Sequence, residues 1–130
     1  MVTQLDCACL VSLREDRLLL VRVRDNEKWY LPGGKIEQGE TPEETLLREL
    51  REELRVDLSP LGLRHVAIVE GPAYGQAGTV RLNCYESTEE FDPVPSSEIS
   101  ECAWLGPDHF PVFAPAVQIL YRDVLGVGTR

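Results

Sequence analysis

The amino-acid sequence predicts an α/β fold in which a mixed β-sheet lies between helices. Short segments rich in β-branched and apolar residues alternate with polar turns, and residues 42–55 have the pattern of an amphipathic helix. The length of 130 residues suits one domain with a sizeable core, and the sequence contains no internal repeat or linker. We therefore expect a single domain over residues 1–130.

The strand signals predict two hairpins and two single strands. The expected strands are residues 4–13, 18–24, 29–31, 63–69, 79–87 and 102–105. Polar residues 14–17 favour a hairpin between the first two strands, and glycine-rich residues 71–78 favour a second hairpin. Acidic residues 89–97 contain two prolines and predict a solvated loop. A final helix is expected over residues 116–125, with a buried side made of Val117, Leu120, Tyr121 and Val124.

A turn and a helix follow the third expected strand. Pro32-Gly33-Gly34 predicts a sharp turn, because glycine adopts conformations that other residues avoid. Thr41 suits the N-cap of the helix, and Glu44 completes a Thr-x-x-Glu capping box. One apolar stripe must face the core, and it comprises Leu46, Leu47, Leu50 and Leu54.

Three carboxylates share a neighbouring face of this helix, at Glu49, Glu52 and Glu53. Like charges at this spacing repel by about 0.2–0.5 kcal/mol per pair in an isolated helix, a cost that a solvated face tolerates. Clustered carboxylates are also the hard oxygen ligands that Mg²⁺ or Mn²⁺ binds together with water and substrate phosphates. The flanking residues decide between a plain surface and a metal site.

Residues 34–56 carry glycine, glutamate and arginine at fixed intervals. The pattern reads Gly-x5-Glu-x7-Arg-Glu-(aliphatic)-x-Glu-Glu and uses Gly34, Glu40, Arg48, Glu49, Leu50, Glu52 and Glu53. Because each of these residue types fills about one position in fifteen, six specified matches arise by chance about once in 10⁷ starting positions. The stretch resembles the Nudix box, and the preceding Leu-Pro-Gly-Gly-Lys also recurs in Nudix proteins. Arg55 stands where that family has glycine, so it must either prolong the helix or adopt a left-handed conformation.

The resemblance covers the whole chain and implies the Nudix α/β/α sandwich. Enzymes similar to this one cleave a nucleoside diphosphate linked to a group X, giving NMP and P–X by attack of water at phosphorus, with Mg²⁺ or Mn²⁺ as cofactor. The compact length and a tail containing Phe110, Pro111 and Pro115 resemble MutT-like nucleoside triphosphate pyrophosphohydrolases. Val112-Phe113-Ala114 stand where MutT has the asparagine that reads guanine, which argues against cleansing of oxidised dGTP.

Two other functional hypotheses fit the sequence. ADP-ribose or a nucleotide sugar is the alternative substrate, because Pro72 fits a weak family marker for ADP-ribose, whereas Tyr74 fits one for dinucleoside polyphosphates. A non-catalytic nucleotide-sensing domain is the alternative of another class. Such a domain would be expected to lose one or more glutamates, and this sequence retains every carboxylate of the box.

The resemblance assigns roles to individual residues. The implied metal ligands are the Gly33 carbonyl and the carboxylates of Glu49, Glu52, Glu53 and Glu98. Glu49 is a ligand or the general base, and Arg48 orients the carboxylates through an ion pair that includes Glu40. Glu101 is an alternative to Glu98, and either one could equally be a surface charge.

Several further residues are candidates for substrate contact. Lys35 follows the glycine pair and is expected near the phosphates by resemblance. Arg22 and Arg24 end a predicted strand on one face, where they could contact phosphate or remain surface charges. Trp29 could stack on a base, although an aromatic residue before a tight turn is more often core. The remaining candidates are Tyr74, Arg81 and Tyr85.

Composition restricts the compartment and partners. The net charge of −9 and the lack of a basic run argue against a nucleic-acid polymer as partner and favour a small-molecule nucleotide. No segment approaches about 20 apolar residues and no signal peptide is evident, so we expect no membrane association and a cytoplasmic location. The spacing of the four cysteines predicts reduced core thiols. A monomer and a homodimer both fit the sequence.

Overall fold

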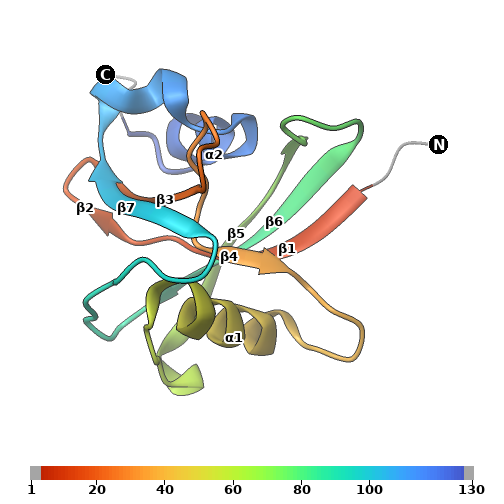
Figure 1. Ribbon diagram of the computed structural model, residues 1–130, viewed down its shortest axis with the longest axis vertical. Coiled ribbons are helices and arrows are strands. Elements are labelled where there is room, and N and C mark those ends of the chain that lie inside the picture. Colours follow the sequence, from red (N-terminus) through yellow and green to blue (C-terminus); the bar gives the residue numbers. More distant parts are fainter. Residues whose placement is uncertain (1–3, 128–130) are drawn as a thin grey trace.

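A computed structural model describes residues 4–127 (Figure 1). The strands are β1 (Gln4–Leu10), β2 (Leu13–Arg14), β3 (Arg17–Val23), β4 (Gly33–Lys35), β5 (Leu63–Pro72), β6 (Thr79–Ser87) and β7 (Ile99–Leu105). The α-helices are α1 (Pro42–Leu54) and α2 (Pro115–Ile119), and α2 continues into a π-helical turn, Leu120–Val124. Short 3₁₀ turns occur at Pro60–Gly62 and Pro107–Val112.

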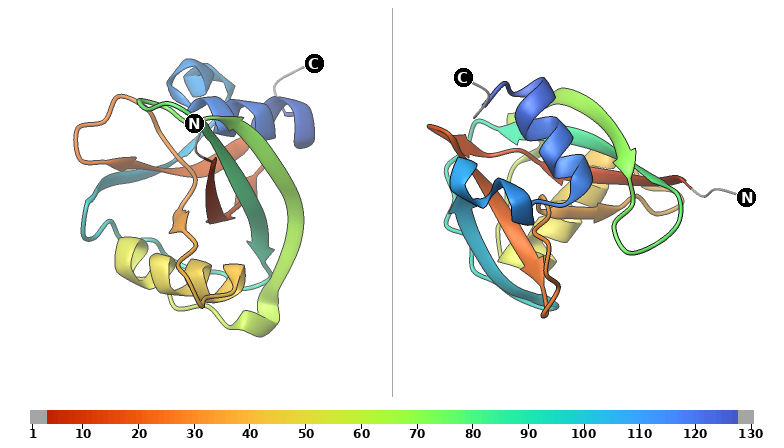
Figure 2. Two further views of the ribbon diagram at one scale, coloured as in Figure 1. Left: turned by 90° about the vertical axis from the view of Figure 1, so that its right-hand side faces the viewer. Right: turned by 90° about the horizontal axis from the view of Figure 1, so that it is seen from above.

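The strands form two sheets. The larger sheet has the order β4-β1-β6-β5 and is mixed, because β1 and β6 are parallel whereas the β1–β4 and β5–β6 pairs are antiparallel. The smaller sheet is antiparallel, with the order β2-β3-β7. Helix α1 lies on one side of the strands and the C-terminal helical segment on the other (Figures 1 and 2). The predicted α/β class, with a mixed sheet between helices, is confirmed.

The first predicted hairpin is only partly present. The antiparallel pairing is limited to Leu13–Arg14 with Arg17–Leu18, and β1 instead lies between β4 and β6 in the larger sheet. The reason is burial on both faces: Ala8 packs on the α1 side of the sheet and Cys9 on the opposite side. A strand that is covered on both faces belongs in the middle of a sheet.

The predicted turn at Pro32-Gly33-Gly34 is wrong, because Gly33 and Gly34 belong to strand β4. A Cβ atom on Gly33 would lie 2.1 Å from the Ala8 carbonyl oxygen, and Gly33 has φ +141°. Glycine is therefore needed here for close backbone approach to β1. The strand expected at residues 29–31 is reduced to two isolated bridges, Val21 to Tyr30 and Trp29 to Phe113.

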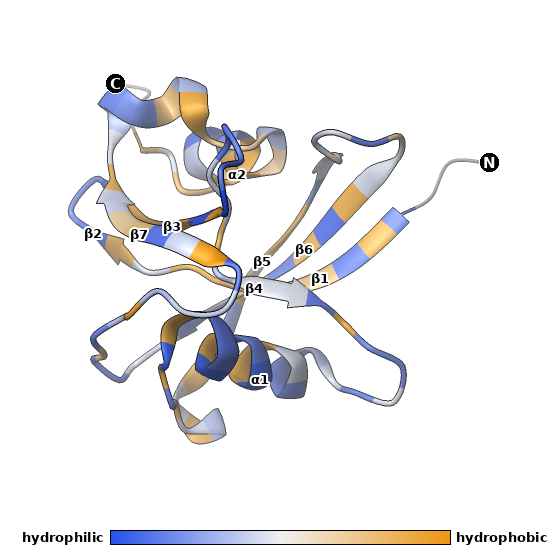
Figure 3. Ribbon diagram, in the orientation of Figure 1, coloured by the Kyte–Doolittle hydropathy of each residue, from blue (hydrophilic) through white to orange (hydrophobic). Residues whose placement is uncertain are grey.

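Helix α1 forms as its local signals predict. The Thr41 hydroxyl accepts from the Glu44 N–H at 3.1 Å, and the Glu44 carboxylate accepts from the Thr41 N–H at 2.9 Å. The helix ends at Arg55, which adopts a left-handed conformation (φ 55°, ψ 36°). The four leucines of the predicted stripe are all buried, and the outward face of α1 is hydrophilic (Figure 3).

The second half of the chain follows the predicted order with changes at its element ends. Strand β5 is longer than expected and pairs with β6 in the second hairpin, and β7 begins three residues early, at Ile99. In the C-terminal segment Val117, Leu120 and Tyr121 are buried, but Val124 is 48% exposed, contrary to prediction. The Leu125 N–H bonds the Leu120 carbonyl, an i→i+5 bond, and this wider turn rotates Val124 away from the core.

Packing of the sheets leaves two apolar clusters. One includes the leucines of α1 with Ala8, Leu10 and Tyr85, and the other joins Cys9, Leu82 and Cys84 to Phe113 and the C-terminal helical segment. All four cysteines are free thiols, as expected. Within residues 4–127, no helix has the length and apolar character needed to cross a membrane.

Candidate active site

Arg48 is the centre of a carboxylate cluster on α1. Its Nε and one terminal nitrogen bond the two Glu40 carboxylate oxygens, each at 2.9 Å, and the other terminal nitrogen bonds Glu49 Oε1 at 2.9 Å. Glu52 lies 3.6 Å from the latter nitrogen. The hydrogen bonds from Arg48, together with one from the Thr45 hydroxyl, hold the pKa of Glu40 at about 2. The expected Arg48–Glu40 ion pair is thus formed, with bidentate geometry.

Glu53 is the buried member of the cluster. Its side chain comes from the C-terminal turn of α1, and the residue is only 6% exposed. Burial raises the pKa of Glu53 to about 8; the hydrogen bond from the Gly33 N–H opposes this rise, and the charge of Glu49 adds to it. Burial also raises the pKa of Glu49, against the effect of Arg48. Two carboxylates therefore lie together in a partly dry site, and among residues 4–127 only Glu49 of the two is paired with a cationic side chain, that of Arg48.

Strand β4 supports this pair of carboxylates. The Gly33 N–H donates to Glu53 Oε1 at 3.1 Å. A Cβ atom on Gly34 would lie 2.6 Å from Glu49 Cδ, so the side chain of Glu49 packs directly on the backbone of that glycine. The two glycines of the Pro-Gly-Gly-Lys phrase thus let β4 approach both β1 and the glutamates of α1.

The acidic loop before β7 is tied to the end of α1. The Val94 N–H donates to the Leu54 carbonyl and the Ser96 N–H donates to the Glu53 carbonyl, both at 2.8 Å. Glu98 consequently lies close enough for its charge to raise the pKa of Glu53. Glu101 instead forms an ion pair with Arg22. Of the two carboxylates left open by the sequence, Glu98 is the one placed towards the cluster.

The donor chemistry of this cluster fits a divalent cation completed by substrate. Within residues 4–127, no three His, Cys, Asp or Glu side chains are arranged to hold one ion together. Mg²⁺, however, is commonly bound through one or two carboxylates, with water and substrate phosphates completing its shell. Glu49 and Glu53 supply two such carboxylates, and Glu52, whose side chain is 55% exposed, lies on the solvent side of them.

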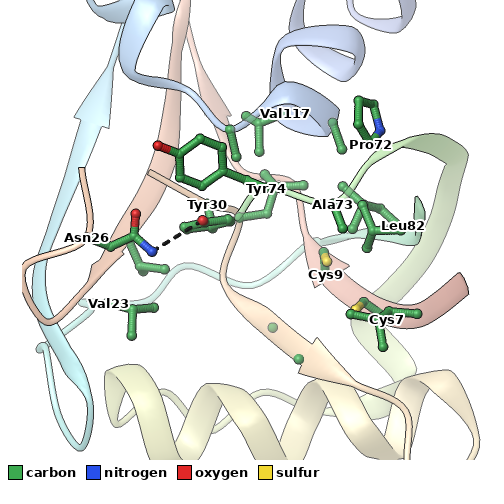
Figure 4. Close-up of a pocket in the computed structure, with 18 of the residues that line it drawn as sticks. Cys7, Cys9, Val23, Asn26, Tyr30, Pro72, Ala73, Tyr74, Leu82 and Val117 are labelled. Carbon is green, nitrogen blue, oxygen red and sulfur yellow. Dashed lines mark hydrogen bonds between the residues drawn. The ribbon is translucent and has the colours of Figure 1, made fainter. Parts of the chain in front are cut away.

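A pocket of about 330 Å³ opens beside Glu53 (Figure 4). Its floor is formed by Cys7 and Cys9 of β1 with Leu82 of β6, and its walls come from β3, residues 26–34, residues 72–76 and α2. Most of the lining is apolar, with Asn26, Tyr30, Tyr74, Gln76 and Glu53 as its polar side chains together with the thiols. Clefts of this size and character bind small molecules.

The thiols in the pocket are unsuited to nucleophilic attack. Burial raises the pKa of Cys7 to about 11, and it raises the pKa of Cys9 as well. A thiol must ionise before it attacks, so neither cysteine provides a nucleophile near neutral pH. The two pocket thiols are therefore excluded as nucleophiles.

The predicted substrate contacts are distributed unevenly around the pocket. Tyr74 lines it, and its hydroxyl donates to Glu27. Lys35 pairs with Cys7 in the sheet register, so its side chain emerges on the pocket side of β4. Arg24 lies with Glu98 in a second, open cavity, and its left-handed backbone (φ 51°) separates it from the face of Arg22.

Three other predicted contacts lie away from the pocket. Trp29 packs against the core beside Phe113, to which it is bridged. Arg81 is on the opposite face of β6, 3.9 Å from Glu70, and Tyr85 is buried in the cluster under α1. The sequence analysis missed Asn26 and Tyr30, which do line the pocket. No sequence signal marks them, because Asn26 falls in a polar loop and Tyr30 in a segment with strand composition.

Comparison with known proteins places these features in a family. The model of the NUDIX domain matches residues 3–124. A MutT-like protein of Streptomyces ambofaciens is 38% identical over 101 residues, which are 75% of this chain and 61% of that relative. Nucleoside triphosphatase NudI of Salmonella arizonae is 28% identical over 120 residues, covering 81% of this chain and 84% of the relative.

The fold is also that of a solved structure. The MutT NUDIX hydrolase from Burkholderia pseudomallei aligns with a TM-score of 0.74 and 22% sequence identity, over 94% of this chain and 98% of that one. At this level of identity the likeness concerns the arrangement of strands and helices.

Proposed function

The chain belongs to the NUDIX family, and we propose that it is a Mg²⁺-dependent pyrophosphohydrolase that converts a nucleoside triphosphate and water to NMP and pyrophosphate. The observation that carries this proposal is the Glu49–Glu53 carboxylate pair, which Arg48 and β4 hold beside a pocket large enough for one nucleoside. Phosphates extending from a nucleoside in the pocket would reach these carboxylates.

Glu49 and Glu53 are the residues that would hold the cation, with Glu52 and Glu98 as further oxygen donors nearby. A bound Mg²⁺ would neutralise negative charge on the diphosphate bridge and lower the pKa of bound water. The buried Glu53 and the half-buried Glu49 would provide the counter-charge for such an ion, since Glu53 has no cationic side chain bonded to it within residues 4–127.

The side chains of the chain itself perform the remaining steps. Arg48 positions Glu49 through one hydrogen bond while anchored by two bonds to Glu40, so the carboxylate direction is fixed. A carboxylate of the cluster accepts the proton that water loses as it attacks phosphorus. Lys35, whose side chain is on the pocket side of β4, would neutralise phosphate charge.

The proposed substrate class rests on the pocket and the relatives. One pocket of about 330 Å³ accommodates a single nucleoside, which agrees with a nucleoside triphosphate. The Salmonella arizonae relative, aligned over most of this chain, is named as a nucleoside triphosphatase. A small-molecule nucleotide is therefore the proposed partner.

The test is product analysis on a panel of nucleotides with Mg²⁺. It should include canonical and oxidised dNTPs, ADP-ribose, nucleotide sugars and dinucleoside polyphosphates. We expect NMP and pyrophosphate from a nucleoside triphosphate, loss of turnover in EDTA, and recovery with Mg²⁺ or Mn²⁺. Full turnover in EDTA would overturn the metal dependence, and a folded protein that cleaves no member of the panel would overturn the proposed activity.

A further inference from the structure

Asn26 and Tyr30 form the polar end of the pocket, on the side of the view away from Cys7 and Leu82 (Figure 4). The Asn26 Nδ2 donates to the Tyr30 hydroxyl at 3.3 Å. The backbone N–H of Lys28 donates to Asn26 Oδ1 at 3.0 Å. Neither residue belongs to the carboxylate cluster of α1.

These two bonds fix which way the Asn26 amide points. A backbone N–H can only donate, so the amide oxygen must face Lys28 and the NH₂ group must face the pocket. One of its two N–H bonds reaches Tyr30, and the second remains available to a ligand. The Asn26 amide is therefore a donor towards the pocket.

Tyr30 presents a second donor. Its oxygen accepts from Asn26, and the Asn26 nitrogen cannot accept a proton in return. In the described part of the chain, no other protein group is hydrogen-bonded to this hydroxyl. The Tyr30 O–H is thus free to donate to a ligand, beside the N–H of Asn26.

Three other polar side chains line the pocket, at Tyr74, Gln76 and Glu53. The Tyr74 hydroxyl is engaged by Glu27, and Glu53 lies next to Gly33 with the carboxylate cluster. Val23 and the aromatic ring of Tyr30 provide apolar surface next to the two donor groups (Figure 4). A ligand that has no acceptors of its own and is buried against the two donors would leave both of them unpaired, which weakens its binding.

We propose that Asn26 and Tyr30 select the nucleobase by donating to a carbonyl oxygen and an adjacent unprotonated ring nitrogen. Guanine presents this pair as O6 and N7, and cytosine as O2 and N3. Adenine places an amino donor beside its ring acceptors, and 8-oxoguanine carries a proton on N7, so both match the donor pair less well. The inference deepens the proposed function and rests on it only in taking a nucleotide as the ligand.

Binding of nucleoside monophosphates, followed by NMR titration in EDTA, tests the selection without requiring turnover. We expect dGMP or dCMP to bind about tenfold or more tightly than dAMP, and dGMP more tightly than 8-oxo-dGMP. If guanine is the preferred base, 7-deaza-dGMP, which lacks the N7 acceptor, should bind no more tightly than dAMP. If cytosine is the preferred base, 7-deaza-dGMP and dGMP should bind equally. Equal binding of all the monophosphates, or no binding of any, would overturn the inference.

Two variants test the residues themselves. Tyr30→Phe keeps the ring and removes one donor, and should reduce the preference over dAMP several-fold. Asn26→Asp should accept from both the Lys28 N–H and the Tyr30 O–H, which removes both donors and shifts the preference towards dAMP. Tyr121→Phe is the matched control, because Tyr121 donates to the Asp16 carbonyl away from the pocket and its loss should leave the ratio unchanged.

The same variants separate this inference from the proposed function. If the protein shows the base preference but hydrolyses no triphosphate, base selection by Asn26 and Tyr30 is supported and the proposed activity is refuted. A protein that hydrolyses all four dNTPs with equal kcat/KM, unchanged in Asn26→Asp and Tyr30→Phe, has the activity and refutes the selection.

Discussion

Glu53 Oε1 accepts a hydrogen bond from the Gly33 backbone N–H at 3.1 Å, which joins the last turn of α1 to the strand beside it. This polar contact links the buried carboxylate to β4, and both residues border the same pocket. The contact connects the helix that carries the carboxylates to the surface on which a nucleoside would lie.

Glu53→Gln should stabilise the metal-free protein while abolishing hydrolysis. The amide keeps the shape of the side chain and removes a charge that is buried beside Glu49, and we expect a gain of about 1–3 kcal/mol at pH 8. Thermal unfolding in EDTA measures this gain. Glu52→Gln, at an exposed position, is the control and should change the unfolding temperature little.

The pH dependence of that gain has a defined sign. Burial raises the pKa of Glu53 from 4.5 to about 8, so the folded protein binds this proton more tightly than the unfolded chain does. The stabilisation of the folded state by protonated Glu53 is fully present below about pH 4.5 and is lost as the pH rises through about 8. The difference between wild type and Glu53→Gln in EDTA should therefore grow from pH 5 to pH 8. If the difference in stability between the two proteins is constant from pH 5 to pH 8, the raised pKa assigned to Glu53 is wrong.

Arg48→Lys should lower kcat and weaken activation by Mg²⁺, each by about 10- to 100-fold. Lysine keeps the charge but cannot bond both oxygens of Glu40 and also reach Glu49 in the fixed geometry of the guanidinium group. Steady-state kinetics over a range of Mg²⁺ concentrations measure both effects. Arg51→Lys, on a side chain that contacts the exposed Asp57, should leave them unchanged; equal kinetics in the two variants would refute the positioning role of Arg48.

Gly34→Ala should reduce activity more than it reduces stability. The new Cβ atom would meet Glu49 Cδ at 2.6 Å and force that side chain to move. We expect kcat to fall about tenfold or more, because displacing a positioned group by an ångström has effects of this size. Gly106→Ala, whose Cβ would make ordinary contacts with Arg17, is the comparison and should retain activity.

Arg55→Gly should stabilise the protein by about 0.5–1 kcal/mol without changing its kinetics. Arg55 ends α1 in a left-handed conformation, which costs a residue with a side chain about 1 kcal/mol and costs glycine little. Chemical denaturation measures the change. The same replacement at Arg51, inside the helix, should instead destabilise by about 1 kcal/mol, and a loss of stability at both positions would contradict the cap assignment.

Local signals accounted for much of the fold and for the helix at the centre of the site. The capping box at Thr41 and the leucine stripe of α1 involve residues only three or four positions apart, so the sequence determines them directly. The β5–β6 hairpin is similarly local. The resemblance to the Nudix box implied that Arg48 pairs with Glu40, and the structure contains this pair.

Only the tertiary structure decided which distant segments meet. The strand β1 pairs with β6, more than 70 residues away along the chain, and this parallel pairing creates the floor of the pocket. The approach of Glu98 to Glu53 depends on hydrogen bonds between residues 94–96 and the end of α1, which no pattern in the loop predicts. Asn26 and Tyr30 acquire their shared orientation from the backbone around Lys28. Residue spacing along a chain determines a helix and its carboxylates, whereas a pocket depends on contacts between elements whose partners are selected by burial on both faces of a sheet.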